Sequence, residues 1–221
     1  MTTTHMTTAS TPIATERGHT RPIALLSCGA VAGPLFLGLA AAQLPLNPGF
    51  DMSRHAYSFL SLGPYGWIQM LNFVVTGCLY AAGAIGLRLA IGRTRWALLV
   101  LVLGLGLGAG LVTAGVFTVD PSFGYPPGAP EGLPAQVSLS GVLHGVAFGV
   151  ALVCWMVLLA MLAVHLLRGR NRWLGILTAL AALSVAAVPA LGFAPTMIYP
   201  SVAYGFLTMT VIFLHLRHRA G

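Results

Sequence analysis

The sequence predicts an all-α membrane protein, a bundle of six transmembrane helices with both termini in the cytoplasm. Apolar residues make up 57% of the 221-residue chain and charged residues only 7%, whereas a soluble domain carries about 25% charged residues. Six apolar stretches reach the ~20 residues that a helix needs to cross a bilayer. The few charges lie between these stretches, and the basic ones gather in alternate segments.

The six expected spans form one domain over residues 22–216. They cover residues 22–44, 65–90, 96–118, 141–166, 174–193 and 201–216. The preceding segment, 1–21, is Thr-rich and lacks apolar periodicity, so we expect a disordered cytoplasmic tail there. Residues 217–221 form a short basic cytoplasmic tail.

The first span has a second interpretation as a signal peptide. Arg21, an apolar run and then Ala40-Ala41-Ala42 resemble the three parts of such a signal. The run is longer than a usual signal core, and it contains Gly29-x-x-x-Gly33, a pattern of close helix packing in membranes. We therefore expect a retained transmembrane helix, with cleavage as the alternative.

Arginine positions set the expected orientation, because cytoplasmic loops near span ends are enriched in Lys and Arg. Ten of the eleven arginines fall in four short segments that this rule places in the cytoplasm. On the other side lie Asp51, Arg54, Asp120 and Glu131. The arginines are spread along the membrane boundary and not gathered in one patch, so we expect lipid contacts and no nucleic-acid partner.

The amino-acid composition of the chain indicates the kind of genome that encodes it. The sequence has no lysine and is rich in Ala, Gly, Pro and Arg. This composition is typical of a high-GC genome, so we expect a bacterial plasma membrane protein.

Polar side chains inside spans should face the bundle interior, because their burial in lipid is costly. In the second span Gln69, Asn72, Thr76 and Tyr80 advance by three and four residues, so they share one helix face. A second polar line in the last span consists of Ser201, Tyr204 and Thr208. These lines form either interhelical hydrogen bonds or a polar path.

Small residues indicate which spans approach closely. The third span contains Gly104, Gly106, Gly108 and Gly110, and the fourth contains Gly141, Gly145 and Gly149. Glycines at such spacings let helix backbones approach each other in a membrane. We therefore expect the third and fourth spans to be tight neighbours.

The first outer connection, residues 49–63, predicts a short amphipathic helix. Asp51 or Ser53 can cap its start, and Gly63 followed by proline ends it. One side would carry Asp51, Arg54, His55, Ser58 and Ser61. Asp51, His55 and Ser58 also suggest a catalytic triad, but three residues on one helix point the same way, and the segment has no sharp nucleophile turn. A solvated polar face is the simpler interpretation.

The second outer connection, residues 119–139, carries five prolines and is long enough to be a lid or binding element. Asp120 lies where the chain leaves the membrane after the third span, and His144 lies one turn into the fourth, so both should lie at one depth if these spans pack together. They are the candidate catalytic residues, as acid and base. His144, Asp120 and His55 are also weak candidates for metal ligands, without a spacing that demands a metal. A hydrogen bond that staples the two spans is the alternative.

The chain resembles a family of bacterial membrane proteins known as domain of unknown function 998. The matching motifs are Ser58-Phe-Leu-Ser-Leu-Gly63, Gly66-Trp67, Asn72-Phe73, Gly115-Val-Phe-x-x-Asp120, Tyr125-Pro-Pro-Gly-Ala-Pro130 and Leu143-His144. The resemblance covers most of the chain except the Thr-rich tail. It implies a six-helix integral membrane protein and supplies no reaction.

Three functions remain open at this point. The first is a protein that binds or moves a membrane lipid or a small polar solute through an outward polar cluster. The expected binding residues are Asp51, Arg54, His55, Ser58, Gln69, Asn72 and Tyr204. The second is a membrane-embedded, lipid-modifying enzyme that uses Asp120 and His144. The third is an accessory subunit that docks another membrane protein. No nucleophile motif, phosphate loop or metal motif is recognisable, and no cofactor is expected.

Overall fold

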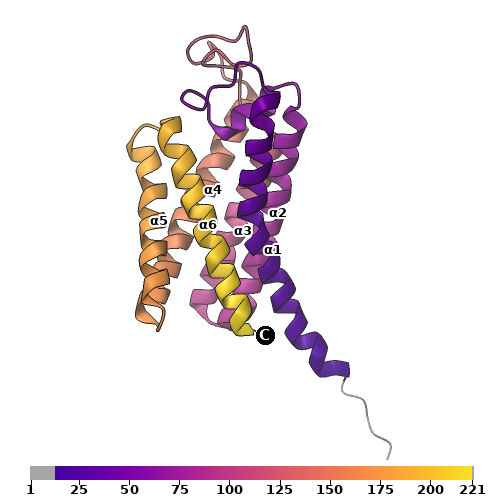
Figure 1. Ribbon diagram of the computed structural model, residues 1–221, viewed down its shortest axis with the longest axis vertical. Helices are drawn as coiled ribbons and strands as arrows, with labels where there is room; N and C mark the ends of the chain where they lie inside the picture. The colour runs from indigo at the N-terminus through magenta and orange to yellow at the C-terminus, as the bar shows by residue number, and fades with distance from the viewer. Residues whose placement is uncertain (1–12, 221) are drawn as a thin grey trace, which may run out of the picture.

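Six long helices, connected in sequence order, build the fold (Figure 1). The computed structural model describes residues 13–220, with side chains from residue 22 onward. Two short 3-10 helices lie between the first two long helices. The elements are α1 (Ile13–Gln43), η1 (Leu44–Leu46), η2 (Tyr57–Leu62), α2 (Gly66–Ile91), α3 (Arg95–Val116), α4 (Leu139–Arg168), α5 (Arg172–Ala190) and α6 (Pro195–Ala220).

All six long helices are apolar and long enough to cross a membrane, which confirms the predicted six-span architecture. The last helix begins at Pro195, six residues before the expected span. The first begins at Ile13, inside the segment expected to be a disordered tail. The rest of that expected tail, residues 1–12, lies outside the described residues.

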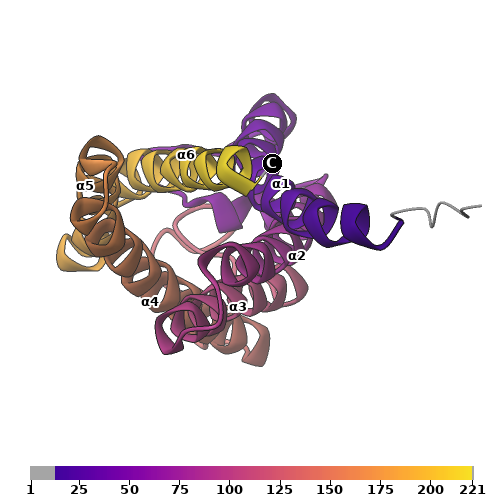
Figure 2. The same cartoon turned by 90° about the horizontal axis from the view of Figure 1, so that it is seen from below.

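The helices form a ring in which each packs against its neighbours in the sequence and α6 returns to α1 (Figure 2). The C-terminus and the N-terminal end of α1 lie at one end of the bundle (Figure 1). The two long connections, residues 44–65 and 117–138, lie together at the other end. We call these two connections the cap.

Glycines set how closely α1, α2 and α3 pack. A Cβ added at Gly77 of α2 would lie 2.5 Å from the carbonyl oxygen of Gly108 in α3. On the α1 face toward α6, a Cβ at Gly33 would lie 2.9 Å from the carbonyl oxygen of Phe206. The backbones therefore approach each other where only glycine fits.

The predicted contact between the third and fourth spans is confirmed, and on the α3 side Gly106 and Gly110 form it, whereas Gly104 and Gly108 face α2. A Cβ on Gly110 of α3 would lie 2.7 Å from the carbonyl oxygen of Ala147. By contrast, a Cβ on Gly145 or Gly149 of α4 would meet nothing within 4 Å. These two glycines of α4 therefore face open space.

The polar line of α2 is buried, as expected for side chains that face the interior of the bundle. Gln43 Nε2 of α1 donates to Gln69 Oε1 at 3.0 Å, and Asn72 Nδ2 donates to the Phe36 carbonyl at 3.0 Å. The line on α6 contacts α5 and does not face α2: Tyr204 donates to the Leu177 carbonyl at 2.9 Å. Both lines therefore form interhelical hydrogen bonds.

The close approach of α2 and α3 predicts a large difference between two glycine substitutions. Gly77→Ala should lower the free energy of unfolding by about 1–3 kcal/mol, because the new methyl group overlaps the Gly108 carbonyl. Gly149→Ala should change it by less than about 1 kcal/mol, because its methyl group meets nothing and alanine favours helix. Thermal unfolding in detergent measures both, and equal melting temperatures would contradict the predicted contact.

Candidate functional site

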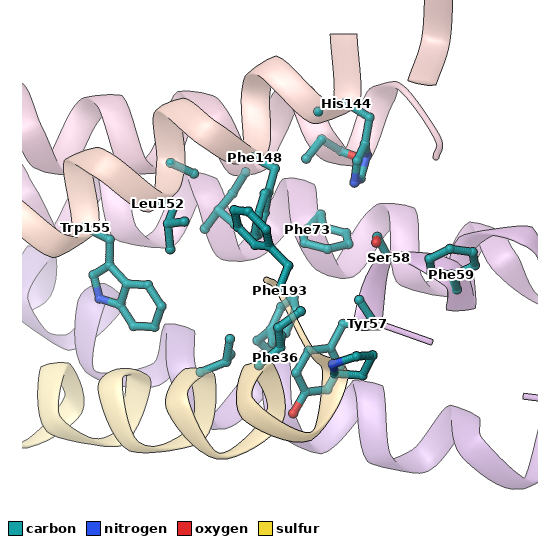
Figure 3. A pocket seen from close by; sticks show the side chains of 18 of the residues that line it. Phe36, Tyr57, Ser58, Phe59, Phe73, His144, Phe148, Leu152, Trp155 and Phe193 are labelled. Carbon is teal, nitrogen blue, oxygen red and sulfur yellow. The ribbon is translucent and has the colours of Figure 1, made fainter. Parts of the chain in front are cut away.

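A cavity of about 670 Å³ lies inside the ring, directly beneath the cap. Its walls come from α1, α2, α3, α4, α6, the two cap connections and the turn between α5 and α6, whereas α5 itself contributes no lining residue. Its helical residues lie in the half of each helix next to the cap, except Trp155, which lies just past the middle of α4. Aromatic rings are prominent in the wall: Figure 3 shows Phe36, Phe73, Phe148, Trp155 and Phe193. Phe206 also lines the cavity. The cavity is therefore apolar over most of its surface.

The charged and hydroxyl groups of the wall come from the cap, and the one imidazole from the neighbouring end of α4. Arg54, Tyr57 and Ser58 come from the first connection, and His144 lies near the start of α4. Arg54 is the one charged residue in the wall within the described part of the chain. The apolar interior thus ends at a polar rim.

His144 is held in a defined orientation by α3. Its Nδ1 lies 2.8 Å from the Phe117 carbonyl oxygen and 3.1 Å from that of Ala114. Because carbonyl oxygens only accept, Nδ1 carries the hydrogen. No hydrogen bond to Nε2 occurs among the described residues. That nitrogen remains available to a molecule in the cavity.

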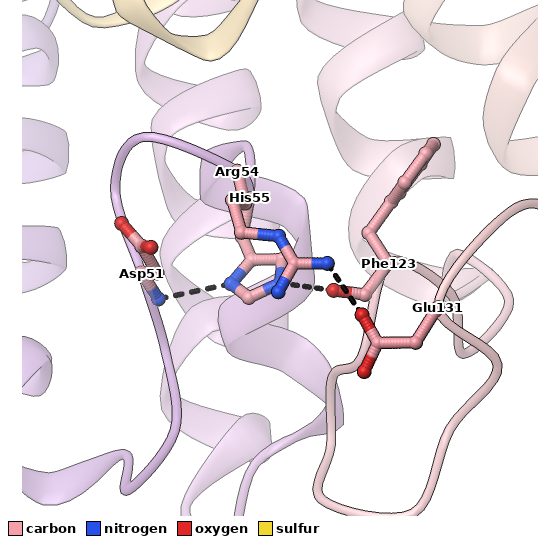
Figure 4. Close-up of polar contacts among 5 residues, drawn as sticks. All are labelled: Asp51, Arg54, His55, Phe123 and Glu131. Atoms are coloured by element: carbon pink, nitrogen blue, oxygen red, sulfur yellow. Dashed lines mark hydrogen bonds and ion pairs between the residues drawn. The ribbon is translucent and has the colours of Figure 1, made fainter.

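His55 joins the two connections of the cap (Figure 4). The Asp51 backbone N–H donates to His55 Nδ1 at 2.9 Å, so Nε2 carries the hydrogen and donates to the Phe123 carbonyl at 2.9 Å. The ring is almost completely buried and lies among Phe50, Phe59 and Tyr125. His55 is therefore a structural anchor, with both nitrogens occupied.

Two further contacts hold the cap in place. Tyr125 of the second connection donates to Asn47 Oδ1 of the first at 2.9 Å. Burial raises the pKa of the Tyr125 hydroxyl above its ordinary value. Tyr199 of α6 donates to the His55 carbonyl at 2.6 Å, which attaches the first connection to the bundle.

An ion pair at the surface also bridges the two connections. Arg54 Nη2 lies 2.7 Å from Glu131 Oε2 (Figure 4). The side chains are 47% and 82% exposed, so water screens the pair. Exposed pairs of this kind contribute about 0–1 kcal/mol. The buried contacts of His55 and Tyr125 therefore do more to hold the cap than this pair does.

The first connection is not the continuous helix expected from Asp51 or Ser53. Asp51 Oδ1 accepts from the Ser53 hydroxyl at 2.7 Å and from its N–H at 2.8 Å, which forms a turn. These bonds lower the pKa of the Asp51 carboxyl group. The helical part is the 3-10 helix η2, which begins at Tyr57 and ends before Gly63.

This geometry does not form a catalytic triad. The His55 ring receives the Asp51 backbone N–H, while the Asp51 carboxylate is bound to Ser53. The other ring nitrogen bonds to Phe123 and not to Ser58. Ser58 instead lines the cavity.

Asp120 and His144 both fasten α4 to the end of α3, but separately. Asp120 accepts from the Ser138 hydroxyl at 2.6 Å and from its N–H at 2.9 Å, immediately before α4 begins. His144 bonds to the carbonyls of α3. Within residues 22–220, no three His, Cys, Asp or Glu side chains gather as a metal site.

The remaining expected binding residues lie outside the cavity wall. Gln69 and Asn72 are fully buried between α1 and α2, and Tyr204 contacts α5. Of the expected set, Arg54, Ser58 and His144 line the cavity. The aromatic wall was missed because an apolar ring inside a span carries no sequence signal that distinguishes a cavity from a lipid-facing surface.

Comparison with known proteins identifies a family but no characterised relative. Residues 30–216 match the family described as Protein of unknown function (DUF998). This match covers most of the chain and agrees with the resemblance noted from the motifs. No curated protein and no solved structure matches the chain.

The buried contacts of His55 predict that it stabilises the cap far more than the surface ion pair does. His55→Ala should lower the free energy of unfolding by about 1–3 kcal/mol, because it leaves the Asp51 N–H and the Phe123 carbonyl without partners. Glu131→Gln should cost less than about 1 kcal/mol. Thermal unfolding measures the stability of both variants. Limited proteolysis within residues 117–138 measures how firmly the second connection is held in each. A larger effect of Glu131→Gln would refute this assignment.

Proposed function

Because the chain belongs to the DUF998 family, whose function is unknown, we propose a function from its own site: it is a multi-pass membrane protein that binds the apolar chain of a lipid in the cavity beneath the cap. The observation that carries this proposal is the aromatic cavity itself. Ligand pockets typically have volumes of roughly 300–1,000 Å³ and walls of hydrophobic and aromatic residues. The cavity has a volume of about 670 Å³ and such a wall.

The character of the wall favours an apolar chain over a small polar solute. A polar solute or an ion needs hydrogen-bonding or charged groups along its path to replace its water. The deep wall is hydrocarbon and aromatic, and the indole N–H of Trp155 is the polar side-chain group found there among the described residues. The other polar side chains of the wall lie at the cap end: Arg54, Tyr57, Ser58 and His144. A molecule with one apolar chain and one polar end matches both the apolar deep wall and the polar rim at the cap end of the cavity.

The arginine distribution supports a location for this site. The basic connections lie at the end of the bundle opposite the cap, and the positive-inside rule assigns that end to the cytoplasm. We therefore place the cap and the cavity in the outer half of a bacterial plasma membrane. The ligand would then be taken from the outer leaflet.

Trp155 provides a direct measurement of chain binding, since it lines the cavity and is 5% exposed. In a protein with Trp67, Trp96 and Trp173 replaced by Phe, lipids with brominated chains should quench Trp155 fluorescence. Bromine quenches at short range, so quenching reports a chain inside the cavity. No quenching by any lipid would refute the proposed function.

Two matched substitutions on α4 test whether this cavity is the site. Gly145→Phe should reduce the quenching of Trp155 at least fivefold, because Gly145 lines the cavity and its new ring enters open space. Gly149→Phe adds the same ring one turn further along α4, at a position outside the wall where an added Cβ also meets nothing within 4 Å. It should leave the quenching unchanged, and an equal loss in both would refute this site.

The orientation is tested separately with two single cysteines in a protein that lacks Cys28, Cys78 and Cys154. Leu133→Cys places a thiol in the exposed cap, and Arg170→Cys places one in the connection between α4 and α5. A membrane-impermeant maleimide should label the first in intact cells and the second only after permeabilisation. The reverse pattern would contradict the proposed orientation.

A further inference from the structure

We infer that the cavity takes an anionic membrane lipid, whose head group binds Arg54 in place of Glu131 and whose chain enters from the bilayer between α4 and the α5–α6 turn. This inference rests on the proposed function and adds the class of head group and the route of entry.

The wall of the cavity reaches the surface of the bundle on one side. Gly145 of α4, and Gly192 and Phe193 of the turn between α5 and α6, line the cavity and are also exposed. Because α5 supplies no lining residue, α4 and this turn border the cavity on that side. The cavity can therefore exchange molecules with the surrounding lipid here.

A single aromatic contact spans this opening. The rings of Phe148 in α4 and Phe193 in the turn lie with centroids 6.0 Å apart, edge to face (Figure 3). Phe193 has a φ of 58° and follows Gly192, with a φ of 71°. A non-glycine residue at such a φ is uncommon and carries strain. A hydrocarbon chain that enters here has to pass between these two rings.

The positive charge of Arg54 at the rim favours a lipid with an anionic head group. Among the described residues Arg54 is the one charged residue in the wall, and no Asp or Glu of residues 22–220 lines the cavity. A guanidinium group binds phosphate with paired N–H donors that match the phosphate oxygens. A lipid with its chain in the cavity and its head at the cap end would place a phosphate within the rim that Arg54 forms.

The Glu131 carboxylate is the ion-pair partner of the Arg54 guanidinium, and a phosphate can replace this carboxylate. The pair is exposed on both sides, and exposed ion pairs contribute little to stability. The Glu131 carboxylate makes no other hydrogen bond among the described residues, so its release breaks no other hydrogen bond there. Arg54 can therefore change partners without disturbing the buried bonds of His55 and Tyr125.

Two neutral groups of the wall complete a site for a phosphate or glycerol group. The Ser58 hydroxyl makes no hydrogen bond within the described part of the chain, and it lines the cavity. His144 Nε2 is similarly without a partner there, because its ring is held through Nδ1. These groups can bind the uncharged hydroxyls of a head group while Arg54 binds its phosphate.

The test compares two lipids with identical brominated chains, phosphatidylglycerol and phosphatidylcholine, in the Trp155 protein. In wild type the anionic lipid should quench at about tenfold lower concentration, as expected for one charged hydrogen-bonding contact. Arg54→Gln should remove this preference and keep quenching by both lipids. Glu131→Gln should strengthen binding of the anionic lipid, because the competing carboxylate is gone.

The controls separate this inference from the proposed function. Arg54→Gln and Glu131→Gln remove the same ion pair, so equal melting temperatures would show that neither effect comes from unfolding. Equal quenching by the two lipids in wild type would overturn the anionic head group and leave chain binding intact. Glycerol phosphate, which has the head group without a chain, should compete only weakly. Competition as strong as that of the lipid would assign Arg54 to a soluble phosphate and overturn the inference.

Discussion

The bilayer cannot hydrate a polar group, and the rest of this structure depends on that constraint. Backbone groups at membrane depth must be paired internally, which makes every span a helix. The same constraint acts on side chains: Gln69 and Asn72 bond to α1, Tyr204 bonds to α5, and His144 bonds to the end of α3. The sequence pattern of these polar residues also suggested a polar path through the bundle. In the structure their side chains instead form hydrogen bonds between neighbouring helices.

The ring is closely packed on one side and open on the other. Glycines bring α2 close to α3 and α1 close to α6, where added methyl groups would overlap backbone atoms. On the far side α4 presents Gly145 and Gly149 to open space, and one pair of aromatic rings joins α4 to the α5–α6 turn. This asymmetry creates the cavity and leaves it one side that faces lipid.

The cap combines a rigid part with an exchangeable one. His55, Tyr125 and Tyr199 make buried bonds that fix the two connections to each other and to α6. Arg54, adjacent to His55 in sequence, points to the rim and is held only by an exposed carboxylate. Because the anchors and the ion pair use different groups, the rim can exchange its partner while the cap stays closed.

The sequence by itself determined the six spans, the buried line on α2 and the contact between α3 and α4. These follow from run length and helical period, which are local properties of the chain. Only the tertiary structure decided that Asp51 forms a turn, that Asp120 and His144 act apart, and that the cavity wall includes Phe148, Trp155 and Phe193. In water, an apolar residue belongs inside. In a membrane both the interior and the lipid-facing surface are apolar, so the sequence of a span cannot tell a cavity wall from an outer face.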